Sequence, residues 1–410
     1  MTRVTATIEG TQKIKELVEK RFSNRTKFLE SIKEKCSKQQ YHNFLAQTRI
    51  EEEAADAIFQ ELDLLKEQYI LSSHPLEYPD GCVSLSSYYY VERFPIESEA
   101  YKQIVREKSL IRIKAPNLMG KSSLVDRIID YALLQDYKTV SLNLNTVPET
   151  TLIDIDKFLR WFSLSVTKAI TKDNKLRDYW DVELFGSVQS CTDYFEEYLL
   201  TNIDCPLVLC LDNLDRLFQY PTVTKDFLEM LRDWYEKGNN ISIWKKLRLV
   251  IAHSTTDYIN QGINYSPFNV GFPLQLPKFN EIQVLDLAQR HQLDWKKEAE
   301  IEVLMAMVGG HPYLVRKAMF ESSYHNIELK KLLKDADEGT GIYNDHLRRI
   351  LTQLQKTPEV LEALKTVAKS SSPVNLGDFN KFKLRSMGLI NQTGELVQPS
   401  CELYRKYFSK

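Results

Sequence analysis

The segment at residues 115–122, with the sequence APNLMGKS, constrains the fold of this chain more than any other. It has the spacing of a phosphate-binding loop, with Ala115 where that motif usually has its first glycine. Such a loop joins a buried strand to a helix, whose N-terminal N–H groups point at phosphate. The short β-branched run at residues 110–113 and the helical spacing from Ser123 onward supply these flanking elements. The sequence therefore predicts a strand–loop–helix unit that binds phosphate groups.

The positions of this loop have distinct expected roles. The amine of Lys121 would neutralise β- and γ-phosphate charge, and the hydroxyl of Ser122 would bind magnesium. The other residues expected to contact the nucleotide are Pro116, Asn117, Leu118, Met119, Gly120 and Ser123. The predicted cofactors are ATP or ADP and Mg²⁺.

A second acidic site follows the apolar run at residues 207–211. Asp212 comes directly after this run, where P-loop proteins place the carboxylate that holds magnesium. An Asp after a strand is also a common cap or turn residue. The distance from the loop and the apolar strand favour the metal role, so Ser122 and Asp212 are the predicted magnesium ligands.

The residues after Asp212 decide whether hydrolysis is expected. Asn213 stands where many ATPases of this type have a glutamate that polarises the attacking water, and an amide cannot accept a proton. Asp215 would replace that base if it faced the γ-phosphate, or would cap the next helix or pair with Arg216. The predicted catalytic set is Lys121, Asp212 and Asp215, with slow or absent ATP hydrolysis.

A further strand is expected at residues 247–252, and polar residues follow it. His253, Ser254 and Thr255 lie where a γ-phosphate sensor is often found, with Ser254 or Thr255 favoured over His253. The alternative is an ordinary hydrogen-bonded turn.

Short apolar strands separated by long helical stretches indicate a parallel sheet covered on both faces. The fold class is therefore α/β, a P-loop NTPase sheet with helical domains around it. The expected domains are an N-terminal helical domain at 1–81, a nucleotide-binding domain at 82–277, a helical lid at 278–342 and a winged-helix domain at 343–410.

Composition excludes several classes of protein. With 54 basic and 56 acidic residues in 410, the chain has no global attraction to nucleic acid or to an anionic membrane. Its six cysteines form no C-x-x-C pair, which argues against a zinc site and a disulfide framework and for a reducing compartment. No apolar stretch has the length of a membrane span or signal core. We expect a cytoplasmic protein.

Taken together, these motifs resemble the AAA-like domain proteins, bacterial STAND-type P-loop NTPases. The resemblance covers roughly residues 84–410, and an alanine at position 115 is normal for that family. The residues that carry it lie at 90–93, 95–96, 111–116, 119–122, 211–212, 215–216, 253–254, 266–271, 309–316 and 382–389.

The resemblance implies further nucleotide contacts. Tyr90 and Val91 would lie in the segment that cradles adenine, Pro312 in the lid would close over the base, and Arg316 would reach the γ-phosphate. The alternatives are core packing for the tyrosine, a helix start for the proline and a solvated surface charge for the arginine. Asn213 departs from the acidic residue usual in the family.

The two ends of the chain suggest partners. Residues 344–410 have eleven Lys and Arg against six Asp and Glu, which allows DNA binding through Arg348, Arg349, Lys381, Lys383 and Arg385. The favoured alternative is an intramolecular latch on the nucleotide domain, as in STAND switches. The N-terminal helices are expected to bind a protein partner.

The function expected from these observations is an ATP- and Mg²⁺-binding STAND-type switch in signalling or antiviral defence. One alternative is a DNA-associated ATPase of initiator or transposition-regulator type that uses the winged helix. A second is a protein-interaction scaffold stabilised by nucleotide. A nucleotide-dependent homo-oligomer is compatible with the first two.

Overall fold

The computed structural model describes residues 3–6, 8–22, 25–45, 50–64, 70–71, 75–171, 173–254 and 269–410. They belong to two compact units, Met1–Glu77 and Tyr78–Lys410. The predicted sensor candidate Thr255 and positions 266–268 of the resemblance lie outside the described residues. Within the described ranges, no helix combines the length and apolar character needed to cross a membrane.

The first unit, Met1–Glu77, is mainly helical, as predicted, and adds three short strands. Strand β1 pairs with β2 and β3 in an antiparallel sheet. Phe28, Phe44 and Ile58 lie in its core, where they are fully buried. Its elements are β1 Arg3–Ala6, α1 Ile8–Arg21, α2 Arg25–Ile32, α3 Lys38–Leu45, β2 Ile50–Glu51, α4 Glu52–Glu61 and β3 Ile70–Leu71.

The second unit contains a five-stranded parallel sheet in the order β5-β6-β7-β4-β8. Because all strands run the same way, their carboxyl ends meet at one edge, where ligands of α/β proteins bind. The strands are β4 Leu110–Lys114, β5 Lys138–Asn143, β6 Leu207–Asp212, β7 Leu247–His253 and β8 Phe272–Gln275.

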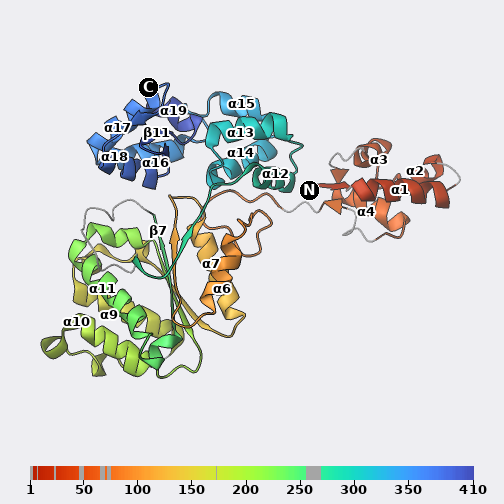
Figure 1. Cartoon of the computed structure of the whole chain (residues 1–410). Coiled ribbons are helices and arrows are strands. Elements are labelled where there is room, and N and C mark those ends of the chain that lie inside the picture. Colours follow the sequence, from red (N-terminus) through yellow and green to blue (C-terminus); the bar gives the residue numbers. More distant parts are fainter. Residues whose placement is uncertain are drawn as a thin grey trace. The chain divides into compact units, whose positions relative to one another are not determined.

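Helices cover both faces of this sheet, as Figure 1 shows. Alternate residues of β6 point to opposite sides: Leu209 packs in an aromatic-rich core under α9 and α11, and Cys210 packs in the core under α6 and α7. The helices on the two faces of the sheet are α6 Ile96–Ile104, α7 Lys121–Leu133, α8 Glu149–Leu152, α9 Ile155–Ile170, α10 Val182–Asp193 and α11 Pro221–Lys237.

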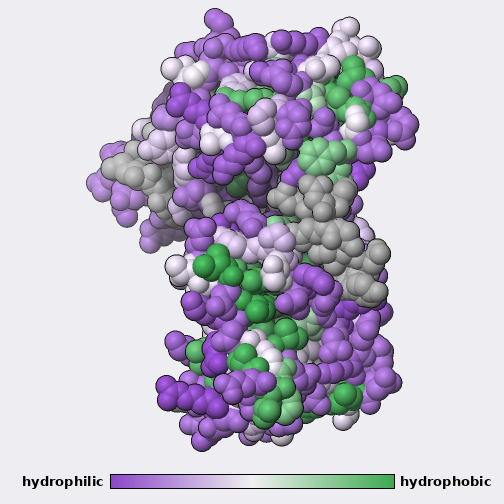
Figure 2. All heavy atoms as spheres, turned by 90° about the vertical axis from the view of Figure 1, so that its left-hand side faces the viewer, coloured by the Kyte–Doolittle hydropathy of each residue, from purple (hydrophilic) through white to green (hydrophobic). Residues whose placement is uncertain are grey.

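The outer surface of these helices carries exposed apolar side chains. Ile153 after α8, and Leu184 and Phe185 in α10, are 65%, 75% and 61% exposed. Figure 2 views the molecule from this side and shows hydrophobic atoms gathered in its lower half.

After the sheet, the chain forms a helical lid and then a C-terminal module, by which we mean residues 343–410. The lid elements are α12 Glu281–Arg290, α13 Glu302–Val308, α14 Pro312–His325 and α15 Leu329–Lys334. The module has an antiparallel sheet in the order β10-β11-β9. Its elements are α16 Asn344–Leu354, α17 Pro358–Lys369, β9 Val374–Asn375, α18 Asp378–Ser386, β10 Ile390–Thr393, β11 Leu396–Pro399 and α19 Glu402–Phe408.

Candidate functional site

The phosphate-binding loop joins the end of β4 to the first residue of α7. Gly120 has φ of +90° and Leu118 has φ of +61°, so two residues turn the backbone into the left-handed region. A Cβ atom at Gly120 would lie 3.1 Å from the guanidinium of Arg93. The glycine is thus required both by its backbone conformation and by a close neighbour.

Lys121 lies buried inside this loop. Its Nζ donates hydrogen bonds to the carbonyl oxygens of Ala115 and Pro116, at 3.0 and 3.1 Å. Burial lowers the pKa of the amine, and the carboxylates of Asp215 and Asp212 partly oppose this shift. A phosphate group beside Nζ would favour the charged amine further, which fits the expected role.

Ser122 of α7 and Asp212 of β6 lie side by side. The serine Oγ donates to Oδ2 of Asp212 at 2.6 Å, and the other carboxylate oxygen accepts from the backbone N–H of Asn213 at 2.8 Å. A hydroxyl beside a carboxylate is the donor chemistry that Mg²⁺ takes, so these residues fit the ion.

Asp215 lies one turn beyond this pair, in the 3₁₀ helix Leu214–Gln219. Burial raises the pKa of its carboxyl, while hydrogen bonds with Ser254 and the charge of Lys121 lower it. Its Oδ1 has no hydrogen-bond partner among the described residues. Arg216 donates instead to Gln219, and no ion pair between Asp215 and Arg216 is found among the described residues. The groups that lower the pKa of Asp215 are Ser254 and Lys121.

Asn213 and His253 mark the neighbouring strand ends. The side-chain amide of Asn213 donates to Oδ1 of Asn143, at the end of β5, at 3.0 Å. The Nδ1 of His253 lies 2.8 Å from the Ser254 carbonyl oxygen, and burial lowers the imidazole pKa to about 4. His253 is therefore a neutral residue at physiological pH.

A mainly apolar pocket opens on one side of the loop. Its cavity volume is about 80 Å³, and the space counted out to bulk solvent is about 600 Å³. The segment before α6, the loop and the lid all contribute to it. The predicted residues that line it are Tyr90, Val91, Leu118, Met119, Gly120, Ser123, Pro312 and Arg316.

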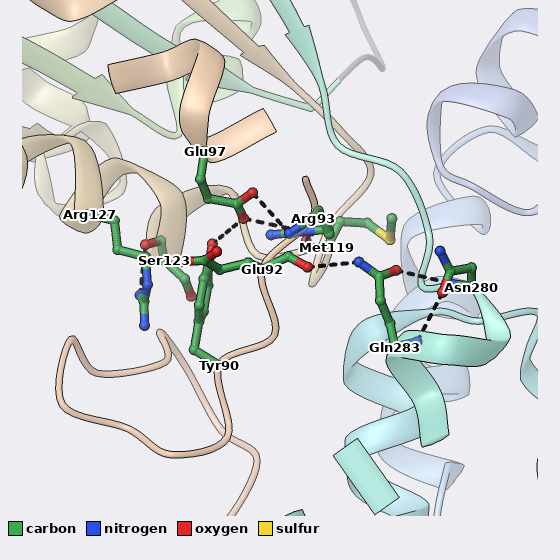
Figure 3. Close-up of polar contacts among 9 residues, drawn as sticks. All are labelled: Tyr90, Glu92, Arg93, Glu97, Met119, Ser123, Arg127, Asn280 and Gln283. Carbon is green, nitrogen blue, oxygen red and sulfur yellow. Dashed lines mark hydrogen bonds and ion pairs between the residues drawn. The ribbon is translucent and has the colours of Figure 1, made fainter. Parts of the chain in front are cut away.

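A buried ion pair connects the segment before α6, which lines this pocket, to the phosphate-binding loop (Figure 3). The Arg93 Nη1 donates to the Met119 carbonyl oxygen at 2.6 Å, and its Nε lies 4.0 Å from the Glu97 carboxylate. Both side chains are less than 5% exposed. Glu97 also accepts from the Tyr90 hydroxyl at 2.7 Å. This network fixes the segment before α6 against the loop.

Two further contacts shape the same region. The Arg127 guanidinium carbon of α7 lies 3.2 Å from the centre of the Tyr90 ring. From the lid, the Gln283 side-chain amide donates to the Glu92 carbonyl oxygen at 2.8 Å (Figure 3). The lid is thus hydrogen-bonded directly to the segment that lines the pocket.

A second, polar cleft lies on the other side of the loop. The sheet side supplies Lys121, Ser122, Asp212 and Asn213, and Asn117 also lines it. Helix α16 of the C-terminal module completes the lining with His346, Arg349, Ile350 and Gln353. An arginine from the far end of the chain thus lies on the same cleft as the phosphate loop.

Pro116, Ser254 and Asp215 line neither the apolar pocket nor the polar cleft, and Arg316 lines only the apolar pocket. Pro116 lines a third cavity, behind the loop, and reaches the site only through its carbonyl bond to Lys121. Arg316 lies in the apolar pocket, 5.5 Å from the centre of the Tyr89 ring, and does not line the polar cleft. Its γ-phosphate role stays a prediction.

The residues proposed for a DNA-binding patch are not gathered on one cavity or face. Arg349 lines the polar cleft and Arg385 lines the third cavity. Lys381 pairs with Glu395 at 2.5 Å and with Asp378 at 3.6 Å. Of these five cations, Lys381 is therefore already paired with carboxylates.

Sequence reasoning missed the structural roles of Arg93, Glu97, Arg127 and Arg349. Arg93, Arg127 and Arg349 act through partners distant in sequence, and no local motif predicts these contacts. The spacing of Arg93 and Glu97, four residues apart, is the one available signal.

Comparison with known proteins supports this fold. A family described as AAA-like domain matches residues 78–410. A Walker-type ATPase of Pyrococcus abyssi is similar at 12% identity and a TM-score of 0.57, over 81% of this chain and 99% of that chain. The Aeropyrum pernix ORC2 protein has 15% identity and a TM-score of 0.44, over 78% and 96%. The first likeness shows the fold alone, and the second is too weak to support an argument. Among curated proteins, none matches the sequence significantly.

Proposed function

We propose that this chain, which belongs to the AAA-like domain family, is an ATP- and Mg²⁺-binding switch of STAND type. In this proposal the C-terminal module is a latch that closes on the nucleotide. The observation that carries it is the position of α16, which lines the same cleft as Lys121, Ser122 and Asp212. One ligand in that cleft would contact both parts of the chain.

The two pockets divide the nucleotide between them. Apolar and aromatic walls near Tyr90 and Pro312 suit the base, and the loop between the pockets would hold the phosphates through backbone N–H groups. Lys121 would exchange its carbonyl partners for phosphate oxygens. Ser122 and Asp212 would hold Mg²⁺, which supplies charge neutralisation at the phosphates when bound.

Turnover is proposed to be slow. Asn213 donates to Asn143 and offers no basic group. Asp215 does not line the polar cleft, but the charge of Lys121 acts on its carboxyl, and we propose it as the replacement base. Its raised pKa makes it a stronger base than an ordinary carboxylate. A long-lived ATP state is what a switch needs.

The latch has two contacts with the nucleotide-binding core. Arg349 of α16 would pair with phosphate, and removing such a charged hydrogen bond costs roughly 1.5–3 kcal/mol. Behind the loop, Gly388 lies so close to Pro116 that a Cβ atom there would approach the ring to 2.9 Å. Nucleotide in the cleft and the close packing behind it would therefore hold the module in the same position.

The test is the release rate of a fluorescent ADP analogue, measured by stopped flow. Arg349→Ala should release it roughly tenfold faster or more, from the energy above. Arg348→Ala is the matched control, because it is an exposed arginine on the same helix outside the cleft.

A second pair of variants tests the packing contact. Gly388→Ala should also speed release, because the methyl group separates the module from Pro116. Gly394→Ala, at φ of +58° with nothing within 4 Å of the added carbon, is its control. Unchanged release in both Arg349→Ala and Gly388→Ala would overturn the latch.

The setting proposed is signalling or defence in the cytoplasm, with the separate N-terminal unit binding a protein partner. Helix α17, β9, α18 and the β10–β11 hairpin follow the order of a winged helix, and we assign the module to that class. The rival function, a DNA-associated ATPase, would instead give salt-sensitive duplex binding that Arg348→Ala weakens.

A further inference from the structure

A third cavity lies behind the phosphate loop, on the side opposite the polar cleft. Its walls come from three parts of the second unit: the ends of β4 and β8, the start of the lid, and the α18–β10 turn of the C-terminal module. It encloses about 1050 Å³ out to bulk solvent. This space is ample for a small organic ligand.

The charges on these walls are of one sign. Lys114 from β4, Lys278 from the lid start and Arg385 from α18 all line the cavity. None of its lining residues, all of which the structure describes, is Asp or Glu. The cavity thus gathers three cations from three different parts of the fold.

Within the part of the chain that the structure describes, no carboxylate forms an ion pair with these three cations. Burial, and then the nearby charges of Arg385 and Arg112, lower the pKa of Lys114. Burial likewise lowers the pKa of Lys278, whose Nζ has only long hydrogen bonds of 3.4 Å to Asn391 and the Ser400 carbonyl. Bringing like charges together costs free energy unless an anion lies between them.

A buried polar atom adds an independent observation. His311, at the start of α14, lines the cavity and is 5% exposed. Its Nδ1 has no hydrogen-bond partner among the described residues. Burial, and then the charges of His346 and Lys278, lower the imidazole pKa to about 3, and hydrogen bonds with backbone groups of Asn117 and His311 oppose this shift. An anion beside the ring would also raise the low imidazole pKa.

The remaining walls combine apolar side chains with the uncharged polar side chains of Gln275, Ser386 and Asn391. Leu276, Phe382 and Ile390 lie among the lining residues. Three cations beside apolar surface suit an organic molecule with several phosphate groups better than a bare inorganic ion.

We propose that this cavity is a second ligand site, separate from the nucleotide site, which binds a small organic polyphosphate. A ligand there bridges Lys114, Lys278 and Arg385, and so holds the sheet, the lid and the C-terminal module together. Binding itself does not depend on the proposed switch. Its consequence, slower opening of the latch, rests on that proposal.

The binding test uses the full chain carrying Lys121→Ala, so that the phosphate loop does not compete. Inorganic tripolyphosphate is the probe, and calorimetry is the measurement. Adding Lys114→Gln and Arg385→Gln should weaken binding at least tenfold. The control adds Lys356→Gln and Lys369→Gln, two exposed cations of the C-terminal module outside the cavity, and should change binding less than twofold.

Three outcomes would overturn the site. They are absence of tripolyphosphate binding to the Lys121→Ala chain, equal weakening in the control, and displacement of the probe by a DNA duplex at equal phosphate concentration. If the probe binds as expected but leaves ADP-analogue release from the wild type unchanged, the site stands and its coupling to the switch fails.

Discussion

Ser122 donates a 2.6 Å hydrogen bond to Asp212, a residue 90 positions further along the chain. The two side chains thus lie together before any ion is bound. Asp212→Asn keeps an oxygen that can accept from Ser122 but loses the negative charge that Mg²⁺ requires. We expect ATP affinity with Mg²⁺ to fall roughly tenfold or more, to the value measured with EDTA.

Calorimetry with and without Mg²⁺ checks this prediction. Asp126→Asn is the control, because Asp126 lines the same cleft but contacts Cys82 rather than Ser122. Wild-type affinity for ATP that is indifferent to Mg²⁺ would show that the pair is structural.

Asn213 provides a gain-of-function prediction. A glutamate at this position can accept a proton from water, and general bases contribute roughly 10²–10⁴-fold to rates. Asn213→Glu should therefore raise ATP turnover at least tenfold, measured by phosphate release. Asn213→Gln, which keeps the amide, should stay at the wild-type rate. Equal rates in the two variants would place the limiting step elsewhere.

The buried Arg93–Glu97 pair predicts a loss of stability. The Glu97 side chain is only 4% exposed, and Arg93→Ala removes the cation that pairs with it. Leaving this buried carboxylate unpaired should lower the free energy of unfolding by about 3–5 kcal/mol. Lys365→Ala removes a surface partner of Glu362 and should cost less than about 1 kcal/mol. Urea unfolding followed by tryptophan fluorescence measures both. All five tryptophans lie in the second unit, so the signal reports on it alone. Similar losses in the two variants would contradict the assigned weight of the buried pair.

The central strands could be predicted closely because their signal is local. Short, mainly apolar runs placed β4, β6 and β7 within one residue of their observed ends. Strand β8 was missed, because Pro273 in a four-residue run argues against a strand. It lies at the sheet edge, where proline is tolerated. The short strands of the N-terminal unit gave too few residues for a period to appear.

The candidate site likewise contains residues that local sequence could predict and one that it could not. The loop and Asp212 were predictable, because a motif and a strand end are contiguous in sequence. The position of Arg349 on the cleft was not, because it depends on how the C-terminal module packs against the loop, through contacts such as Gly388 with Pro116. Charge counting alone assigned that arginine to a DNA patch.

His346 predicts how stability changes with pH. Burial, and then the charge of Arg349, lower the pKa of its imidazole to about 4, against 6.5 for an ordinary histidine. His311 packs against its ring and Tyr404 shares a 2.8 Å hydrogen bond with Nε2. Between these two pKa values the unfolded chain binds the proton and the folded chain does not. The contribution of the neutral His346 imidazole to the free energy of unfolding is therefore complete above pH 6.5 and is lost as the pH falls toward 4.

At pH 5 this single residue should cost the fold about 2 kcal/mol relative to pH 7.5. Glutamine does not titrate in this range. Between pH 7.5 and pH 5, the free energy of urea unfolding should therefore fall by about 2 kcal/mol less in His346→Gln than in the wild type. His42→Gln, in the N-terminal unit, is the control and should follow the wild type by tryptophan fluorescence. The prediction is contradicted if His346→Gln retains the full pH dependence of the wild type. The imidazole would then be charged in the folded protein and exposed to solvent between α16 and the lid.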